Sequence, residues 1–432
     1  MSLSQVQTLA AQTLAAVASG KNLSDELAHI IAQNPELTAQ DKGMLQDIAY
    51  GCQRHLGSLK FMLGKMLNKP IDNEALQSYL LVALYQLNHT QNAPHAVVNE
   101  AVNHIAQIGH GQYRSFSNAI LRRFLREKDG LNKACRYDDV AKHNLPIWLQ
   151  KTLQNQYPKH WHNIATAFQA HPPLTLRVNR RHADAEQYLA ALHDAGLNGK
   201  ILDDYAIRLA QAVPVAQLPR FAEGWVSVQD WGAQQAAYLL NPQHGERVLD
   251  ACAAPGGKTG HILELADCDL TALDIAPQRL QRVRDNLARL HFQAALHCAD
   301  AQNLSDWYNG EPFDAILADI PCTASGTIKR NPDIKWLRRP TDAYKTARQQ
   351  EPMLDALWTT LKSGGRMLLA TCSIFEEENQ QQCHRFLNRH PDAQLRTEKI
   401  LIPSEKQDGF YYALIEKHYP RFQAASTRKQ RQ

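Results

Sequence analysis

Two periodicities divide this sequence. From Val6 to about Lys128, apolar residues recur at the i, i+3, i+4, i+7 spacing of amphipathic helices, and no alternating stretch intervenes. From Trp225 onward, short apolar runs alternate with helical patterns, which is typical of a sheet flanked by helices. Residues 130–220 are mixed. The pattern therefore predicts a multidomain chain.

The first region is predicted to be an all-α helical bundle over residues 1–140. Gly20 ends an alanine-rich first helix, and Pro94 marks a loop before a later helix. One strongly apolar stretch is expected to form a central helix. Its leucines are Leu76, Leu80, Leu81, Leu84 and Leu87. The last helix of the bundle is predicted over Phe116 to Glu127.

The mixed region is predicted to be a small α+β module over residues 141–224. Residues 174–179 alternate like a strand, and residues 185–195 follow as a helix closed by glycine. Arg180 lies between them, so RNA could lie against this module. The alternative is an ordinary connecting domain with a polar surface.

The third region is predicted to be an α/β Rossmann-like domain over residues 225–420, followed by a basic, flexible tail over 421–432. Strands are expected at 247–250, 270–274, 294–297, 313–319, 365–371 and 409–416, with helices at 258–265, 277–290 and 344–361.

Composition narrows the class of protein. Of 432 residues, 44% are hydrophobic and 21% charged, and the net charge of +4 is too small to identify an anionic partner by itself. No basic leader or long apolar run is visible, so we expect neither a signal peptide nor a membrane-spanning helix. The eight cysteines show no metal-ligand spacing, so we expect reduced thiols, a cytoplasmic location and no metal site.

Acidic residues stand where four predicted strands end. Asp250, Asp274 and Asp319 close three strands, and Asp300 lies just past another. Ligands of open α/β sheets bind outside the carboxyl ends of the strands, and an acidic residue after the second strand can bind ribose hydroxyls. These positions predict a nucleotide-type cofactor.

The turn after the first of these strands favours S-adenosylmethionine over ATP. Gly256-Gly257-Lys258-Thr259 resembles the end of a phosphate loop, but Cys252 stands where that motif requires glycine. S-adenosylmethionine needs acidic partners for its ribose and ammonium groups and no phosphate cradle. The expected cofactor-binding residues are Cys252, Ala253, Ala254, Pro255, Gly256, Gly257, Lys258, Asp274, Asp300 and Asp319.

Two cysteines are candidates for a nucleophile. Cys322 follows Asp319-Ile320-Pro321, and Cys372 follows the fifth predicted strand, so both lie at the ligand-binding edge. A structural role in the core is the alternative for either thiol. The residues alone do not rank the two.

Basic residues gather in two further places. The last helix of the bundle carries Arg122 and Arg123, which could contact phosphates or simply form a solvated helix face. Residues 329–339 lie between the two cysteines and combine cations with an aromatic ring, a combination that suits RNA phosphates and a stacked base. A charged surface loop is the alternative. The candidates in this stretch are Lys329, Arg330, Lys335 and Trp336.

Residues 5–128 resemble the NusB-type helical domain, an RNA-binding module. The resemblance rests on Asp41-Lys42-Gly43, Gly51, Ala93-Pro94, Val98-Asn99-Glu100-Ala101-Val102 and Phe116-Ser117-Asn118-Ala119-Ile120-Leu121-Arg122.

Residues 225–417 resemble the RNA cytosine-5 methyltransferases. The resemblance rests on Asp250-Ala-Cys-Ala-Ala-Pro-Gly-Gly-Lys-Thr259, Asp319-Ile-Pro-Cys322 and Thr371-Cys-Ser373, with Val228-Gln-Asp230 and Asp408-Gly-Phe410 at the flanks. At and next to the second motif, Ile320 and Thr323 depart from the pattern of that family, at positions that we expect to carry no chemistry. With the helical domain in front, nearly the whole chain resembles the bacterial 16S ribosomal RNA cytosine-5 methyltransferases.

The resemblance implies a mechanism and a partner. A thiolate adds to C6 of cytosine, the methyl group of S-adenosylmethionine passes to C5, and a base then removes the C5 proton. It implies that Cys372 attacks, Cys322 helps to release the product, Asp319 contacts cofactor and base, and Lys258 polarises the site. DNA cytosine-5 enzymes instead attack with the Pro-Cys thiol. We expect 16S ribosomal RNA as the partner and a monomer.

Two other functions stay open. The chain could be an RNA-binding assembly factor whose methyltransferase fold is only a scaffold. It could also methylate transfer RNA or DNA by the same chemistry.

Overall fold

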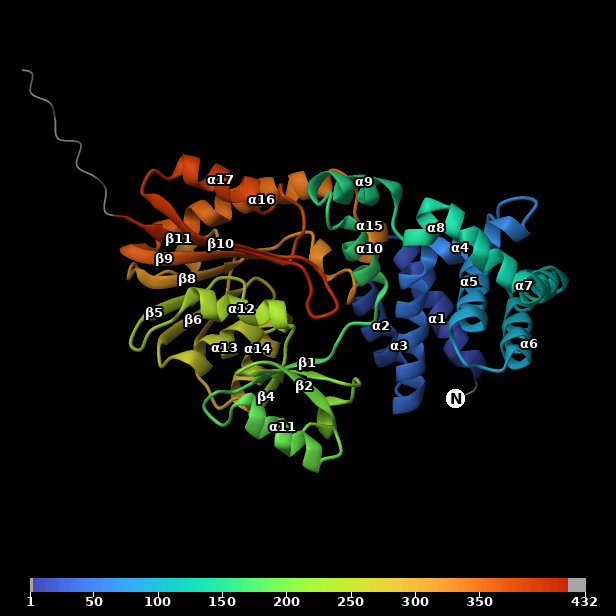
Figure 1. Cartoon of the computed structure of the whole chain (residues 1–432), viewed down its shortest axis with the longest axis horizontal. Coiled ribbons are helices and arrows are strands. Elements are labelled where there is room, and N and C mark those ends of the chain that lie inside the picture. The colour runs from blue at the N-terminus through green and yellow to red at the C-terminus, as the bar shows by residue number, and fades with distance from the viewer. Residues whose placement is uncertain (1–2, 419–432) are drawn as a thin grey trace, which may run out of the picture. The chain divides into compact units, whose positions relative to one another are not determined.

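The computed structural model describes residues 3–418, which divide into two compact units (Figure 1). The helical unit contains residues 3–172 with two later segments, 325–342 and 403–405. The sheet unit contains residues 173–324, 343–402 and 406–418. This division joins residues 141–172 to the helices and the rest of the small module to the large sheet. The predicted tail over 421–432 lies outside the described residues.

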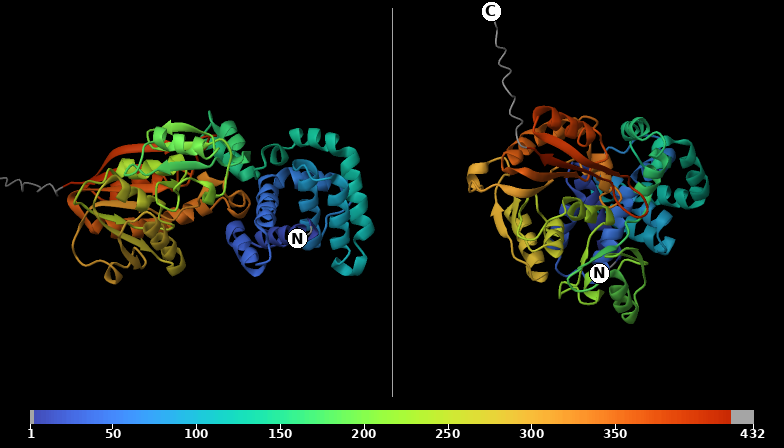
Figure 2. Two further views of the ribbon diagram at one scale, coloured as in Figure 1. Left: turned by 90° about the horizontal axis from the view of Figure 1, so that it is seen from below. Right: turned by 60° about the vertical axis from the view of Figure 1, so that its left-hand side comes forward.

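The helical unit is a bundle of α-helices around a continuous apolar core. Its described residues contain no strand. Figure 2 shows this part of the chain, coloured blue to teal, as helices in both views. The helices are α1 (Leu3–Ala18), α2 (Leu23–Gln33), α3 (Ala39–Arg54), α4 (Leu56–Met66), α5 (Glu74–His89), α6 (Pro94–Ile105), α7 (Arg114–Ala134), α8 (Asp139–His143), α9 (Ile147–Gln156), α10 (Trp161–Gln169) and α15 (Ile334–Leu337). The predicted all-helical bundle is confirmed.

Local sequence signals explain where these helices begin. Thr38 and Asp41 form a reciprocal capping box at the start of α3. Pro94 is the first residue of α6, where its missing N–H removes no intrahelical bond, so it starts the helix rather than marking a loop before it. The leucine-rich α5 is buried on most sides and contacts α1, α3, α4, α6 and α7, which confirms the predicted central helix.

The small module forms one antiparallel sheet of order β2-β3-β1-β4. Its strands are β1 (Thr175–Val178), β2 (Gly199–Asp203), β3 (Ala206–Leu209) and β4 (Val226–Val228), and its helix is α11 (Ala185–Asp194). Alternation along β1 sends Leu176 and Val178 into a core with Tyr188 and Leu192 of α11. The side chain between them, Arg177, points to the opposite face of the sheet.

The large sheet has seven strands in the order β10-β11-β9-β8-β5-β6-β7. Its strands are β5 (Arg247–Asp250), β6 (Asp269–Asp274), β7 (Ala295–Cys298), β8 (Phe313–Asp319), β9 (Leu361–Thr371), β10 (Ala393–Leu401) and β11 (Phe410–Lys417). Strands β9, β8, β5, β6 and β7 are parallel neighbours, while β11 and β10 join antiparallel at one edge. This arrangement confirms the Rossmann-like class and the predicted strands.

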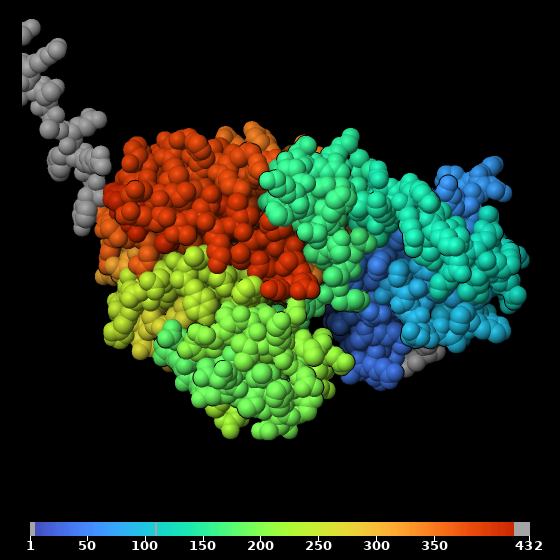
Figure 3. Space-filling view, in the orientation of Figure 1, coloured from blue at the N-terminus to red at the C-terminus, as the bar shows by residue number. Residues whose placement is uncertain are grey.

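Helices cover both faces of the large sheet, and each face has its own apolar core (Figure 1). One face carries α12 (Trp231–Leu240), α13 (Gly257–Leu265) and α14 (Pro277–Arg289), and the other carries α16 (Asp342–Thr359) and α17 (Gln380–Arg389). The sequence pattern did not predict α12, α17 or β10. In space-filling view the green small module and the yellow-green half of the large sheet form a continuous surface (Figure 3). Among residues 3–418, no helix is long and apolar enough to cross a membrane.

Candidate active site

The parallel strands bring the predicted acidic residues to one edge of the large sheet. A cavity of about 370 Å3 opens there. Its walls include Cys252, Ala254, Asp274, Asp300, Asp319, Cys322 and Cys372, all expected from the sequence. They also include residues that sequence reasoning missed, namely Ala251, Ile275, Arg279, Ala299, Ala301, Gln302, Ile320, Pro321 and Met353. The other predicted turn residues, Ala253, Pro255, Gly256, Gly257 and Lys258, lie beside the cavity rather than in its wall.

Two carboxylates lie at this edge of the sheet, Asp274 in the cavity wall and Asp250 buried beside it. Asp274 accepts hydrogen bonds from the backbone N–H groups of Ala254 (3.3 Å) and Ala276 (3.1 Å), and Arg279 lies 3.4 Å from it. Asp250 is buried and accepts a hydrogen bond from the Thr259 hydroxyl at 2.7 Å. Its second oxygen has no hydrogen-bond partner among the described residues. Burial raises the pKa of Asp250 to about 7.

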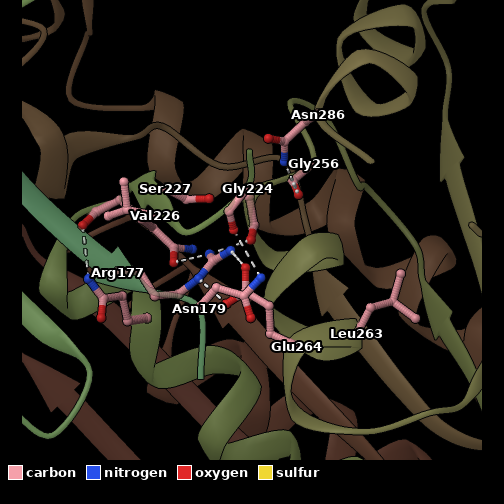
Figure 4. Close-up of polar contacts among 12 residues, drawn as sticks. Arg177, Asn179, Gly224, Val226, Ser227, Gly256, Leu263, Glu264 and Asn286 are labelled. Atoms are coloured by element: carbon pink, nitrogen blue, oxygen red, sulfur yellow. Dashed lines mark hydrogen bonds and ion pairs between the residues drawn. The ribbon is translucent and has the colours of Figure 1, made fainter. Parts of the chain in front are cut away.

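The glycine turn is held in place from two sides. Gly256 adopts a φ of 95°, and a Cβ atom there would meet Val283 of α14 at 3.0 Å, so only glycine fits. Asn286 of α14 donates to the Gly256 carbonyl at 3.0 Å (Figure 4). Arg177 of β1 donates to the Gly257 carbonyl at 2.7 Å. The small module therefore contributes directly to the geometry of the cofactor turn.

Arg177 is itself locked by a buried ion pair. Its guanidinium donates to both oxygens of Glu264, at 2.8 and 2.6 Å (Figure 4). A further N–H donates to Gln229 at 2.6 Å. The side chains of Arg177 and Glu264 are 0% and 2% exposed. A charge pair this deep is stable only because each of the three guanidinium nitrogens finds an acceptor.

The two cysteine sulfurs are in contact. Sγ of Cys322, in the loop after β8, lies 3.5 Å from Sγ of Cys372, at the end of β9. The hydrogen bond to Cys372, burial, and the negative charges of Cys372 and Glu378 together raise the pKa of Cys322 well above its usual range. The protonated form of Cys322 is therefore favoured, and either thiol can be the donor in the hydrogen bond between the two sulfurs.

A cation stands next to this pair. Nζ of Lys258 lies 2.5 Å from Oδ2 of Asp319 at the end of β8. Burial alone would lower the pKa of Lys258, but the charge of Asp319 and the hydrogen bond to it raise that pKa overall, and a thiolate at Cys372 adds to the effect. Lys258 is therefore a positive charge close enough to Cys372 to interact with a thiolate there. Cys252 has a buried thiol whose pKa is raised, with its sulfur 4.0 Å from that of Met353, so it is a wall residue rather than a nucleophile.

The segment between the two cysteines is not an exposed RNA loop, which corrects the expectation for Lys329, Lys335 and Trp336. The amino groups of Lys329 and Lys335 are buried and donate to the carbonyls of Ser404 (2.5 Å) and Arg54 (2.8 Å). The indole N–H of Trp336 donates to the carbonyl of Gln53 at 2.8 Å.

The physical reason is the end of α3, where the last carbonyls of a helix have no intrahelical donor. Lys335 and Trp336 supply these donors, and Asp333 accepts a hydrogen bond from the N–H of Leu23 at the start of α2 (3.0 Å). The segment thus caps two helices of the helical unit. Arg330 is half-buried and stays a prediction.

The other predicted RNA contacts lie at the surface. Arg122 is exposed on α7 and donates to Asn118 at 3.0 Å. Arg123 pairs with Glu127 at 2.9 Å and donates to the Met66 carbonyl. Arg180 is exposed at the end of β1, with its guanidinium 5.6 Å from the ring centre of Tyr205. Within residues 3–418, no group of three or more His, Cys, Asp or Glu side chains is arranged to hold a metal ion.

Comparison with known proteins matches each part of the chain. Residues 237–423 match the family model of the 16S rRNA methyltransferase RsmB/F, residues 4–126 match the NusB family, and residues 145–216 match the ferredoxin-like domain of RsmF/B-like methyltransferases.

Curated relatives and solved structures extend this match. The ribosomal RNA small subunit methyltransferase B of Salmonella newport (strain SL254) is 42% identical, over 95% of this chain and 98% of that protein. The crystal structure of PH0851 has a TM-score of 0.79 at 23% identity and covers 96% of this chain and 100% of its own, which shows a shared fold. The structure of NSun6 from Pyrococcus horikoshii with SFG has a TM-score of 0.56 at 19% identity, covering 63% of this chain and 98% of its own.

Proposed function

Because this chain belongs to the 16S rRNA methyltransferase RsmB/F family, we propose that it transfers a methyl group from S-adenosylmethionine to C5 of a cytosine in 16S rRNA through a covalent cysteine adduct. The observation that carries the proposal is the contact of two cysteine sulfurs, 3.5 Å apart, at the edge of a cavity lined by carboxylates. We further propose that it acts as a monomer in the cytoplasm.

The cavity suits S-adenosylmethionine. Its wall offers the carboxylates of Asp274, Asp300 and Asp319. The buried Asp250 lies beside the wall, and its charge acts on the cavity from there. These groups match the ribose hydroxyls and positive charges of the cofactor, and the apolar side chains of Ile275 and Met353 offer a surface for its base. SFG, the ligand of the NSun6 structure, is an analogue of S-adenosylmethionine. When bound, the cofactor supplies an electrophilic methyl group.

The cysteine pair suits a division of labour. C5 of cytosine is a weak nucleophile, and addition of a thiolate to C6 makes it a strong one. We assign the attack to Cys372, because the raised pKa of Cys322 favours its protonated form, which can donate a hydrogen bond to the sulfur of Cys372. The same S–H bond stabilises the Cys372 sulfur again when the C6–S bond breaks. Cys322 thereby assists release.

Lys258 and Asp319 complete the site. Their ion pair, 2.5 Å long, holds a positive charge near Cys372 and an acceptor at the end of β8. The target cytosine must leave its stack to reach this edge. Once the methyl group is in place, the proton on C5 must pass to a proton acceptor. Replacement of Asp319 by Asn would remove the partner of Lys258 and lower the rate of methyl transfer.

RNA containing 5-azacytidine, which traps the adduct, tests this proposal. Cys372→Ala should abolish both adduct and methylation, whereas Cys322→Ala should accumulate adduct on natural RNA. Cys268→Ala is the control, because Cys268 precedes β6 and lies at the opposite end of the sheet. Exchange of the first two outcomes would assign the attack to Cys322. Failure of the unaltered protein to methylate RNA would favour an assembly factor with an inert methyltransferase fold.

A further inference from the structure

One buried carboxylate joins the two loops that carry the cysteines. Glu378 accepts a hydrogen bond from the backbone N–H of Thr323 at 2.8 Å and one from its hydroxyl at 2.6 Å. The hydroxyl of Ser373 donates to the same carboxylate. Thr323 directly follows Cys322, and Ser373 directly follows Cys372. A single side chain therefore holds the residue next to each sulfur.

The surroundings make this junction rigid. Glu378, Thr323 and Ser373 are all at most 1% exposed. Asn379, the next residue, accepts from the Thr371 hydroxyl at 2.5 Å and donates to the Ser373 carbonyl at 2.9 Å. Buried polar networks whose members are paired fix one conformation, because breaking any bond leaves an unsatisfied group in a medium of low dielectric.

We propose that Glu378 is a positioning residue that keeps the sulfurs of Cys322 and Cys372 in contact during catalysis. The inference rests on the proposed function for its catalytic meaning, but the sulfur contact itself is independent of any RNA. It also assigns a role to Thr323, a motif position that the sequence analysis expected to carry no chemistry. The hydroxyls of Thr323 and Ser373 donate to the same oxygen of the Glu378 carboxylate, so the two loops are coupled through that oxygen.

The charge of Glu378 has a second effect. It contributes to the raised pKa of Cys322, after the hydrogen bond to Cys372, burial and the charge of Cys372. Glu378→Gln preserves the shape of the side chain and removes this charge. An amide can still accept from the backbone N–H of Thr323 and donate to the two hydroxyls, whose hydrogens can rotate away. This variant therefore separates charge from shape.

The sulfur contact can be measured directly in the full-length protein without RNA. Diamide takes two electrons and two protons from a pair of neighbouring thiols, and peptide mass spectrometry then detects a Cys322–Cys372 disulfide. We expect the disulfide to form rapidly in the unaltered protein and more slowly in Thr323→Val, which lacks the hydroxyl that donates to Glu378. Thr323→Ser restores the hydroxyl and should restore the rate. Glu246→Gln is the matched control, since Glu246 is a carboxylate paired with Arg366 at the opposite end of the sheet.

Single-turnover methylation measures the catalytic consequence. We expect the rate constant of methyl transfer to fall by about 10- to 100-fold in Thr323→Val, the loss that a displacement of about 1 Å causes in a positioned reaction, with the KM for RNA unchanged. In Glu378→Gln the pH above which product release becomes slow should move downward, because Cys322 ionises more readily and a thiolate cannot donate a hydrogen bond to Cys372.

Bridging and methyl transfer at unaltered rates in both Glu378→Gln and Thr323→Val would overturn the proposal. So would a rise in the KM for RNA with no change in the rate constant, since that result would indicate a role in binding. If the unaltered protein bridges its cysteines faster than Thr323→Val but never methylates RNA, the proposed function fails, while the inference that Glu378 holds the two sulfurs in contact stands.

Discussion

Removal of the buried Arg177 side chain should destabilise the sheet unit more than any surface change. Arg177 makes four hydrogen bonds, two to Glu264 and one each to Gln229 and the Gly257 carbonyl. Arg177→Met keeps most of the volume but leaves the carboxylate of Glu264, 2% exposed, without its cation. Breaking a buried pair in this way costs about 3–5 kcal/mol. For a unit of this size, that loss corresponds to a fall in Tm of about 6–20 °C.

Thermal melting and urea unfolding of the full chain would measure this loss, and hydrogen exchange of peptides from β1 and α13 would locate it. Arg177→Met with Glu264→Leu should recover part of the stability, because no buried charge is then left unpaired. Arg396→Ala is the surface control. It breaks an exposed pair with Glu416 and should cost about 0–1 kcal/mol. A loss below about 1 kcal/mol in Arg177→Met, or a double variant no better than the single one, would refute the reasoning.

Three further predictions concern the cofactor turn and the capping segment. The affinity for S-adenosylmethionine should rise as the pH increases through about 7, because the buried Asp250 becomes an anion only above its raised pKa; calorimetry should find this dependence abolished in Asp250→Asn. Lys335→Met should lower the stability of the helical unit by about 1–3 kcal/mol, because the amino group caps a helix, and should leave the salt dependence of RNA binding unchanged. By contrast, Arg122→Ala should make RNA binding less dependent on salt, because the exposed Arg122 is proposed to contact phosphate. Gly256→Ala should weaken cofactor binding and stability more than Gly196→Ala, since both glycines have positive φ but only Gly256 has a neighbour that a Cβ would meet; equal losses measured by calorimetry and melting would contradict the close approach.

The sequence predicted the parts of this protein that depend on local order. Period-3.6 and short apolar runs located the helical bundle and the parallel strands, because these patterns follow from which face of an element is buried. The ends of the strands then located Asp250, Asp274 and Asp319 at one edge, since parallel strands share their carboxyl ends. The same reasoning placed Cys322 and Cys372 near each other.

Prediction from the local sequence failed where a polar side chain forms a hydrogen bond with a residue far away in the chain. Lys335 and Trp336 have the composition of an RNA-binding loop, yet they cap the end of α3, some 280 positions earlier in the chain. No periodicity shows which helix end lacks donors. Strand β10 and helix α17 were also missed, because β10 is a half-exposed edge strand and α17 is short and largely polar.

The sequence by itself determined the class of the fold, the cavity edge and the two candidate thiols. Only the tertiary structure decided how the thiols differ. The pKa of Cys322 is raised because its thiol is buried against Cys372 and near Glu378, an environment assembled from the ends of β8 and β9 and the segment just before α17. Likewise, the role of Arg177 depends on Glu264, which lies 87 positions later in the chain. Ionisation and positioning are set by neighbours in space, and those neighbours exist only after the chain has folded.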